Sequence, residues 1–161
     1  KFMLENVKMQ QHCQDKITEL LGVDPVFIDS SIHSAAMRKR LYWFNWEPTL
    51  PEKEDIKFQD ILTEGYVEKD KSWCVLEAWN RFPVSTESAK GRYKRSMMPI
   101  IFSSPDFDWS KGWREPNRIE TERLMCMPDN YTKSVSEKTA KGLLGNGWNL
   151  KTVKHIFGCM A

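Results

Sequence analysis

Short apolar runs and one stretch of helical spacing alternate along the first part of the chain. Residues 2–4 are apolar and end in two polar residues, which suits a buried strand. Residues 11–21 place apolar side chains at helical spacing before Gly22, a suitable C-cap. Residues 25–29 form a second apolar strand whose proline stands at its first position. The order strand, helix, strand predicts parallel strands joined by a right-handed crossover.

The pattern changes after an aromatic strand at residues 39–46. Prolines and glycines then interrupt the chain, leaving room for a short helix at 55–63 and a strand at 97–102. Helical spacing returns at 118–126 and 136–144, and again after Asn149, which can cap a helix. We therefore predict an α/β fold in three parts: a partial sheet (1–46), a loop-rich insert (47–113) and C-terminal helices that return to the sheet (114–161).

Composition narrows the class of protein. Hydrophobic residues make up 40% of the 161 residues and charged residues 29%, which is enough for a packed core. No apolar run approaches the length of a membrane span, so we expect no membrane partner. The four cysteines and three histidines show no metal-ligand spacing, which predicts no metal site and reduced thiols in an intracellular protein.

The net charge of +2 hides an asymmetry. Residues 51–80 hold 4 Lys/Arg and 8 Asp/Glu, whereas residues 81–114 hold 7 Lys/Arg and 3 Asp/Glu. The basic stretch is either a solvated surface or a face directed at phosphate groups, and composition leaves both interpretations open.

Three charged residues stand at candidate ligand positions. Glu5 follows a predicted strand, and ligands bind beyond the carboxyl ends of strands in open α/β sheets. Arg38 and Arg40 alternate along a strand, so both guanidinium groups point to one face and a negative or polar partner is expected between them. The alternatives are an ordinary strand-end carboxylate and a salt-bridged sheet edge.

Four motifs in order resemble the DNA cytosine-5 methyltransferase family. Residues 2–7 are similar to its Glu-Asn-Val motif, and residues 38–40 to the last part of its Gln-x-Arg-x-Arg motif. The final Gly-Asn motif resembles Leu144-Gly145-Asn146-Gly147-Trp148. The motif that supports the target recognition domain is matched by Arg114, Glu120, Arg123, Leu124, Pro128 and Asp129, with Asn117 in place of its leading Thr.

Within the family the chain looks closest to the de novo methyltransferase group. Ser34, Ala35 and Ala36 precede the two arginines and the aromatic strand, as in that group, and Ala36 replaces the usual Gln. The resemblance implies the C-terminal part of a Rossmann-like, S-adenosylmethionine-dependent methyltransferase sheet, with residues 47–113 as the target recognition insert.

The resemblance also implies roles for the candidate residues. Glu5 would bind the ring nitrogen and amine of a flipped cytosine, and it must be protonated when it donates to the nitrogen. Arg40 would donate to the carbonyl oxygen, and Arg38 would hold the nucleophile region or a nearby phosphate. The cofactor S-adenosylmethionine would touch Asn146, Gly147 and Trp148. Double-stranded DNA would meet a basic cluster in the insert: Lys90, Arg92, Lys94 and Arg95.

The residues that react are not in this sequence. The family's nucleophile lies in a Pro-Cys motif upstream of Glu-Asn-Val, and no cysteine here follows a proline. The Gly-rich cofactor loop is also upstream. We therefore expect a C-terminal fragment that is inactive alone and pairs with a missing N-terminal catalytic half or a second subunit. A non-catalytic DNA-binding or regulatory module is the alternative, in the nucleus or the bacterial cytoplasm.

Overall fold

The computed structural model describes residues 1–47, 49–81 and 83–160. Its larger sheet has three strands, β1 (Met3–Val7), β2 (Val26–Asp29) and β3 (Lys39–Phe44), in the order β1-β3-β2. Because β3 is antiparallel to both neighbours, β1 and β2 run in the same direction. The two strands are therefore parallel, as the sequence predicts, but they do not pair with each other, since β3 lies between them.

The side chains of β3 explain its central place. Its last four residues are all buried, whereas β1 and β2 each keep exposed positions. A strand that is apolar on both faces is best covered when it has a neighbour on each edge and a helix on each face. The aromatic strand therefore takes the middle, and the two less apolar strands take the edges.

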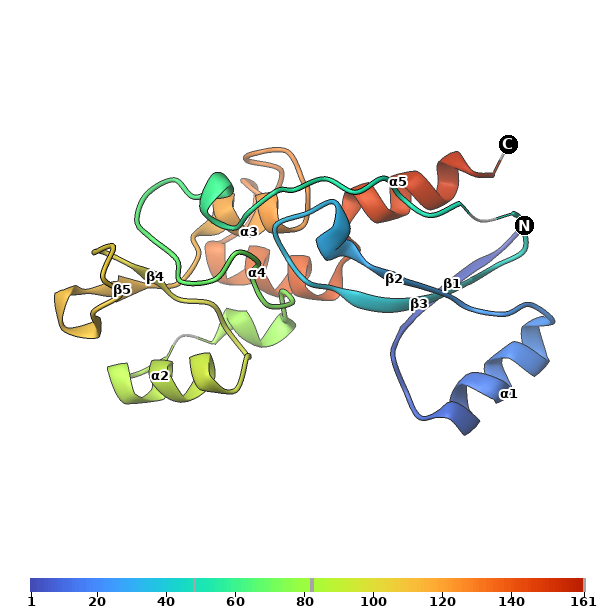
Figure 1. Ribbon diagram of the computed structural model, residues 1–161, viewed down its shortest axis with the longest axis horizontal. Coiled ribbons are helices and arrows are strands. Elements are labelled where there is room, and N and C mark those ends of the chain that lie inside the picture. The colour runs from blue at the N-terminus through green and yellow to red at the C-terminus, as the bar shows by residue number, and fades with distance from the viewer. Residues whose placement is uncertain (48, 82, 161) are drawn as a thin grey trace.

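One helix covers each face of this sheet (Figure 1). Helix α1 (Gln11–Leu21) lies against one face, where Trp43 Nε1 of the sheet donates a hydrogen bond to Thr18 Oγ1 of the helix at 3.0 Å. Gly22 ends α1 in the left-handed region, with φ 68°, which confirms the predicted C-cap.

The opposite face of the sheet packs against α5 (Leu150–Gly158). Ile156 of this helix shares a core cluster with Tyr42 and other apolar side chains of β2 and β3. The predicted cap is confirmed, because the Asn149 side chain accepts a hydrogen bond from the backbone N–H of Thr152 at 3.2 Å.

The insert is less regular. Its elements α2 (Thr86–Lys94), β4 (Ile101–Phe102) and β5 (Trp113–Arg114) lie at the other end of the molecule from the sheet (Figure 1). The predicted helix at 55–63 is only a 3-10 turn, and the predicted strand at 97–102 is reduced to two residues. A longer helix, α2, and the strand β5 are present where no element was predicted. The elements of the insert are η2 (Gln59–Ile61), η3 (Glu77–Asn80), α2 (Thr86–Lys94), β4 (Ile101–Phe102), η4 (Trp109–Lys111) and β5 (Trp113–Arg114), after η1 (Ser30–Ile32) in the sheet part.

The C-terminal helices join the insert to the sheet. Helix α3 (Arg118–Leu124) ends two residues before the predicted 126, and α4 (Glu137–Asn146) runs two residues past the predicted 144. Helix α4 packs so closely on η3 that a Cβ built on Gly145 would lie 2.2 Å from the backbone N of Glu77. Glycine is therefore required there for contact between insert and helix.

The larger apolar core crosses all three parts of the chain. Most of its members come from the insert, including Trp79 and Phe102, which are at most 2% exposed. The others come from the sheet part and the C-terminal helices, namely Ala35, Ala36, Leu124, Met125 and Leu144. Among the described residues no helix is long and apolar enough to cross a bilayer. The fold is mixed α/β, as the sequence predicts.

Candidate functional site

Glu5 and Arg40 meet on one face of the larger sheet. Glu5 lies in β1 and Arg40 in β3, and Arg40 Nε stands 2.7 Å from Glu5 Oε1. Both side chains are about 15% exposed, at 15% and 14%. The contact is an ion pair without hydrogen-bond alignment, since Glu5 Oε1 has no hydrogen-bond partner within the described part of the chain. The carboxylate therefore keeps capacity to bind a further polar group.

Arg40 also keeps donors. One Nη1 hydrogen goes to the carbonyl oxygen of Lys39 at 2.9 Å, and Nη2 faces the sulfur of Cys74 at 3.9 Å. A guanidinium group has five N–H donors in a fixed plane. Three of them face a neighbour, counting the Nε that faces Glu5. The rest of the group can donate to a ligand that enters beside Glu5.

Arg38 occupies a different environment although it points to the same side. It is 4% exposed, and it donates to the carbonyl oxygens of Val75 at 3.3 Å and Gly147 at 2.6 Å. Arg38 directly precedes β3, so these bonds tie the start of the strand to the insert and to the end of α4. The geometry assigns Arg38 backbone partners, where the sequence suggested the nucleophile region or a phosphate.

Two further residues belong to this site. Tyr42 is the residue opposite Glu5 in the β1–β3 register and is almost fully buried. Burial, and next the nearby carboxylate of Glu5, raise the pKa of Tyr42 to about 12, so the phenol stays neutral. The period-2 alternation that relates Arg38 to Arg40 also reaches Tyr42 and could have identified it.

Cys74 is the polar group between the two arginines. Its sulfur accepts from Arg38 Nη1 at 3.5 Å and faces Arg40 Nη2 at 3.9 Å. The expectation of a polar partner between the guanidinium groups is therefore met by a residue from the insert. Nothing in the sequence indicated which residue this would be.

The three candidate cofactor residues lie at the end of α4. Asn146 is exposed, and Gly147 is the C-cap whose carbonyl oxygen binds Arg38. Trp148 is 44% exposed and lines a hollow of about 180 Å³ with apolar side chains of β1 and α5. Cofactor-sized ligands occupy pockets of roughly 300–1,000 Å³. The hollow thus fits only part of such a molecule.

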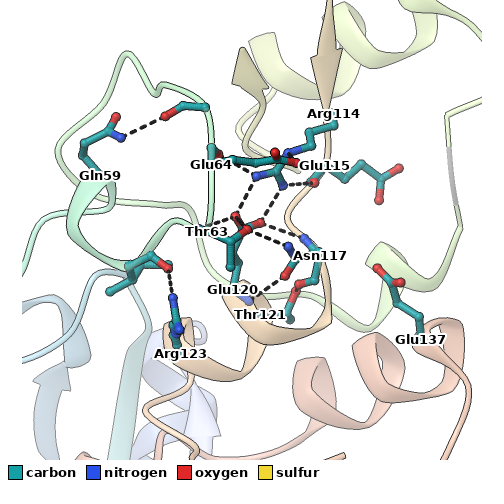
Figure 2. A network of polar contacts seen from close by, with 12 residues as sticks. Gln59, Thr63, Glu64, Arg114, Glu115, Asn117, Glu120, Thr121, Arg123 and Glu137 are labelled. Atoms are coloured by element: carbon teal, nitrogen blue, oxygen red, sulfur yellow. Dashed lines mark hydrogen bonds and ion pairs between the residues drawn. The ribbon is translucent and has the colours of Figure 1, made fainter. Parts of the chain in front are cut away.

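A buried carboxylate, Glu120, organises the junction between insert and helices (Figure 2). Arg114 donates to both of its oxygens, at 2.6 and 2.7 Å. Thr63 donates through its backbone N–H at 2.9 Å and its hydroxyl at 2.8 Å. Asn117 and Glu120 form a capping box at the start of α3, in which the side chain of each accepts a hydrogen bond from the backbone N–H of the other.

Charge and burial act on Glu120 in opposite directions. Burial alone raises the pKa of this carboxyl, but the hydrogen bonds from Arg114, Thr63 and Asn117 hold it below its ordinary value. The ionised form is therefore the one that the fold stabilises. A second ion pair lies nearby: Arg123 donates from Nε and Nη2 to the two carboxylate oxygens of Asp129, at 2.8 and 2.6 Å. Its Nη1 also donates to the carbonyl oxygen of Ile61.

The four basic residues of the insert lie on or next to α2, not in a loop. Lys90 pairs with Glu87 at 3.1 Å and lies over the ring of Trp109. Arg92 donates to the carbonyl oxygen of Arg81. Lys94 and Arg95 are exposed. Helix α2 lies at the opposite end of the molecule from the sheet that carries Glu5 and Arg40 (Figure 1).

Comparison with known proteins identifies the fold. No family model matches the chain. A methyltransferase from Entamoeba histolytica, EhMeth, superposes with a TM-score of 0.64 over 99% of this chain, at 14% identity. The Dnmt2 methyltransferase of S. pombe gives 0.58 over 97% at 17% identity, and a Spodoptera frugiperda DNMT2 mutant gives 0.56 over 98% at 16%.

These similarities show a methyltransferase fold. The chain spans less than two thirds of the length of each of these proteins: 62% of EhMeth and 65% of the other two. Nearly the whole chain is accommodated by the superposition, so the sheet, the insert and the C-terminal helices all belong to that fold.

Proposed function

We propose that this chain is the base- and DNA-recognising part of a DNA cytosine-5 methyltransferase. The observation that carries the proposal is the Glu5–Arg40 pair, a carboxylate and a guanidinium side by side on one sheet face with unused hydrogen-bonding capacity. The methyltransferase fold and the order of the four motifs support it.

Cytosine presents three polar groups that suit this pair. Its ring nitrogen and exocyclic amine would meet the carboxyl of Glu5, and its carbonyl oxygen would meet the free donors of Arg40. A protonated Glu5 donates to the ring nitrogen while accepting from the amine. These contacts withdraw electrons from the ring, which lets a thiolate add to it and the neighbouring carbon accept a methyl group. The base must first leave the helix to reach this face.

The reacting groups come from outside residues 1–161. S-adenosylmethionine, when bound, supplies an electrophilic methyl group. Trp148 would pack against an apolar part of it and Asn146 would hydrogen-bond its polar end, which agrees with an exposed amide and a partial hollow. The nucleophilic thiolate and the rest of the cofactor site would belong to an N-terminal half or to a second subunit.

Arg38 has a supporting part in this proposal. Its bond to the Gly147 carbonyl connects the base-binding strand directly to the cofactor motif. It keeps the two sites at a fixed separation, which a methyl transfer between them requires. The basic residues of α2 would contact phosphate groups of the duplex, and they contribute affinity rather than base choice.

Binding to an unpaired base tests the pocket in the chain itself. We expect the chain to prefer a duplex with cytosine opposite an abasic site over the same duplex with thymine, because such a base leaves the stack easily. Thymine offers a donor where Glu5 must donate, so the preference should reach at least about tenfold, or about 1.4 kcal/mol.

Glu5→Ala should abolish the preference, whereas Glu19→Ala, which removes an exposed carboxylate of α1, should not. Fluorescence anisotropy gives both affinities, and a thermal melt shows that each variant is folded. Equal affinity of the unsubstituted chain for cytosine and thymine would refute the proposed pocket.

A further inference from the structure

A segment of the insert runs beside the residues that lead into β3. The backbone N–H of Ser72 donates to the carbonyl oxygen of Ala35 at 2.8 Å, and the N–H of Met37 donates to that of Ser72 at 2.9 Å. Lys71 adds a hydrogen bond to the carbonyl of Ser34 at 2.9 Å. These bonds fix the register of the segment, and the register places Cys74 next to both arginines.

The thiol of Cys74 is oriented as well as placed. Its S–H can donate to the carbonyl oxygen of Val75 at 3.5 Å. The sulfur lone pairs are then left for Arg38 Nη1 at 3.5 Å and Arg40 Nη2 at 3.9 Å. Sulfur is a weak but polarisable acceptor, so one atom can serve two cationic donors.

The two arginines depend on this sulfur to different degrees. Arg38 is buried and is also held by two carbonyl oxygens, so it keeps its position without the thiol. Arg40 has Glu5 at Nε and Lys39 at Nη1, and Cys74 faces its Nη2. Without the sulfur, Arg40 can turn about its long side chain and repulsion from Arg38 favours such a turn.

We propose that Cys74 is a positioning residue for base recognition. It holds the Nη2 corner of Arg40, so that the free N–H groups of the guanidinium face the carbonyl oxygen of the base. This inference rests on the proposed function, because the base that Arg40 meets is the cytosine of that proposal. It also makes the insert, through one side chain, part of the base pocket.

The test compares Cys74→Ala, which removes the acceptor, with Cys74→Ser, which keeps an acceptor at nearly the same place. Cys13→Ala is the matched control, since Cys13 lies on α1 and its thiol has the neighbouring His12 as its hydrogen-bond partner. Each variant is measured for its affinity ratio between the cytosine and thymine duplexes. We expect Cys74→Ala to lower the ratio roughly fivefold, about 1 kcal/mol, and Cys74→Ser to restore most of it.

Side-chain ¹⁵N spectra of arginine give a readout that needs no ligand. In the unsubstituted chain and in Cys74→Ser, Arg40 should show a restrained guanidinium group. In Cys74→Ala its signals should average through faster rotation, while those of Arg38 stay unchanged.

The outcomes separate the two ideas. A chain that does not discriminate cytosine from thymine contradicts the proposed function. A chain that discriminates equally well with and without the Cys74 thiol, or an Arg40 signal that Cys74→Ala leaves unchanged, contradicts the positioning role alone. A lower thermal midpoint with an unchanged affinity ratio also counts against it, because it marks a structural residue only.

Discussion

Replacing Glu120 with glutamine keeps the shape of a buried side chain and removes its charge. The carboxylate accepts five hydrogen bonds, two from Arg114, two from Thr63 and one from the backbone of Asn117. A glutamine amide has one acceptor oxygen and one NH₂ group. Whichever way the amide turns, at least two donors then face another donor.

The number of donors at each oxygen decides how the amide should turn. One oxygen, Oε1, meets three donors, and the other, Oε2, meets Arg114 Nη1 and the N–H of Asn117. The cheaper orientation puts the NH₂ group at the second position, where two hydrogen bonds are broken. A buried donor left without a partner costs about 1–3 kcal/mol. Because Arg114 is 29% exposed and can regain water, we expect a total loss of about 2–4 kcal/mol.

Urea denaturation of the chain, followed by tryptophan fluorescence, measures this loss as a change in the free energy of unfolding. Glu87→Gln is the matched control, because this carboxylate pairs with Lys90 but is 83% exposed. The control should change stability by no more than about 0.5 kcal/mol. If Glu120→Gln costs as little as Glu87→Gln, Glu120 does not organise the junction of insert and helices.

Three further results are expected. The free energy of unfolding should fall as the pH drops below about 4.3, the ordinary pKa of Glu. The folded state lowers the pKa of Glu120, so its stabilisation is complete above that pH and is lost as the pH falls towards the lowered pKa. Urea titrations at several pH values should show a smaller fall for Glu120→Gln. Gly145→Ala should destabilise the chain by at least about 2 kcal/mol, because its Cβ would overlap the backbone of Glu77, whereas Gly158→Ala, with open space around it, should be neutral or stabilising in the same assay. Changing Arg92, Lys94 and Arg95 to Ala should weaken duplex binding and reduce the slope of log affinity against log salt by about 0.9 for each phosphate group that is no longer neutralised. Lys16→Ala is the control, and a triple variant with the same slope as this control would show that DNA binds to another face.

Local chemistry made part of the fold predictable. The aromatic strand, the left-handed cap at Gly22 and the cap at Asn149 each follow from side chains that act within a few residues of themselves. Helix α2 was missed because only one of its nine residues, Ala89, is buried and Gly91 interrupts it. Its stability comes from the Ser85 cap and from packing against the rest of the insert, which periodicity does not reveal.

The site divides in the same way. Glu5 and Arg40 could be selected from the sequence because each stands in or beside a predicted strand and in one of the ordered motifs, and the structure brings them to 2.7 Å on adjacent strands. The partners of Arg38 could not be selected, since Val75 and Gly147 use backbone carbonyls that carry no sequence signal. Cys74 enters from the insert, and only the folded chain shows where the insert lies.

Methyl transfer tests the central claim most directly. The chain alone, and the chain combined with the proposed N-terminal half or second subunit, would each be incubated with duplex DNA and methyl-labelled S-adenosylmethionine. We expect no transfer by the chain alone. For the combination we expect label on carbon 5 of cytosine, a Pro-Cys motif in the added part, and a loss of at least about 100-fold in Glu5→Ala. Transfer by the chain alone, or label on any other base position, would contradict the proposed function.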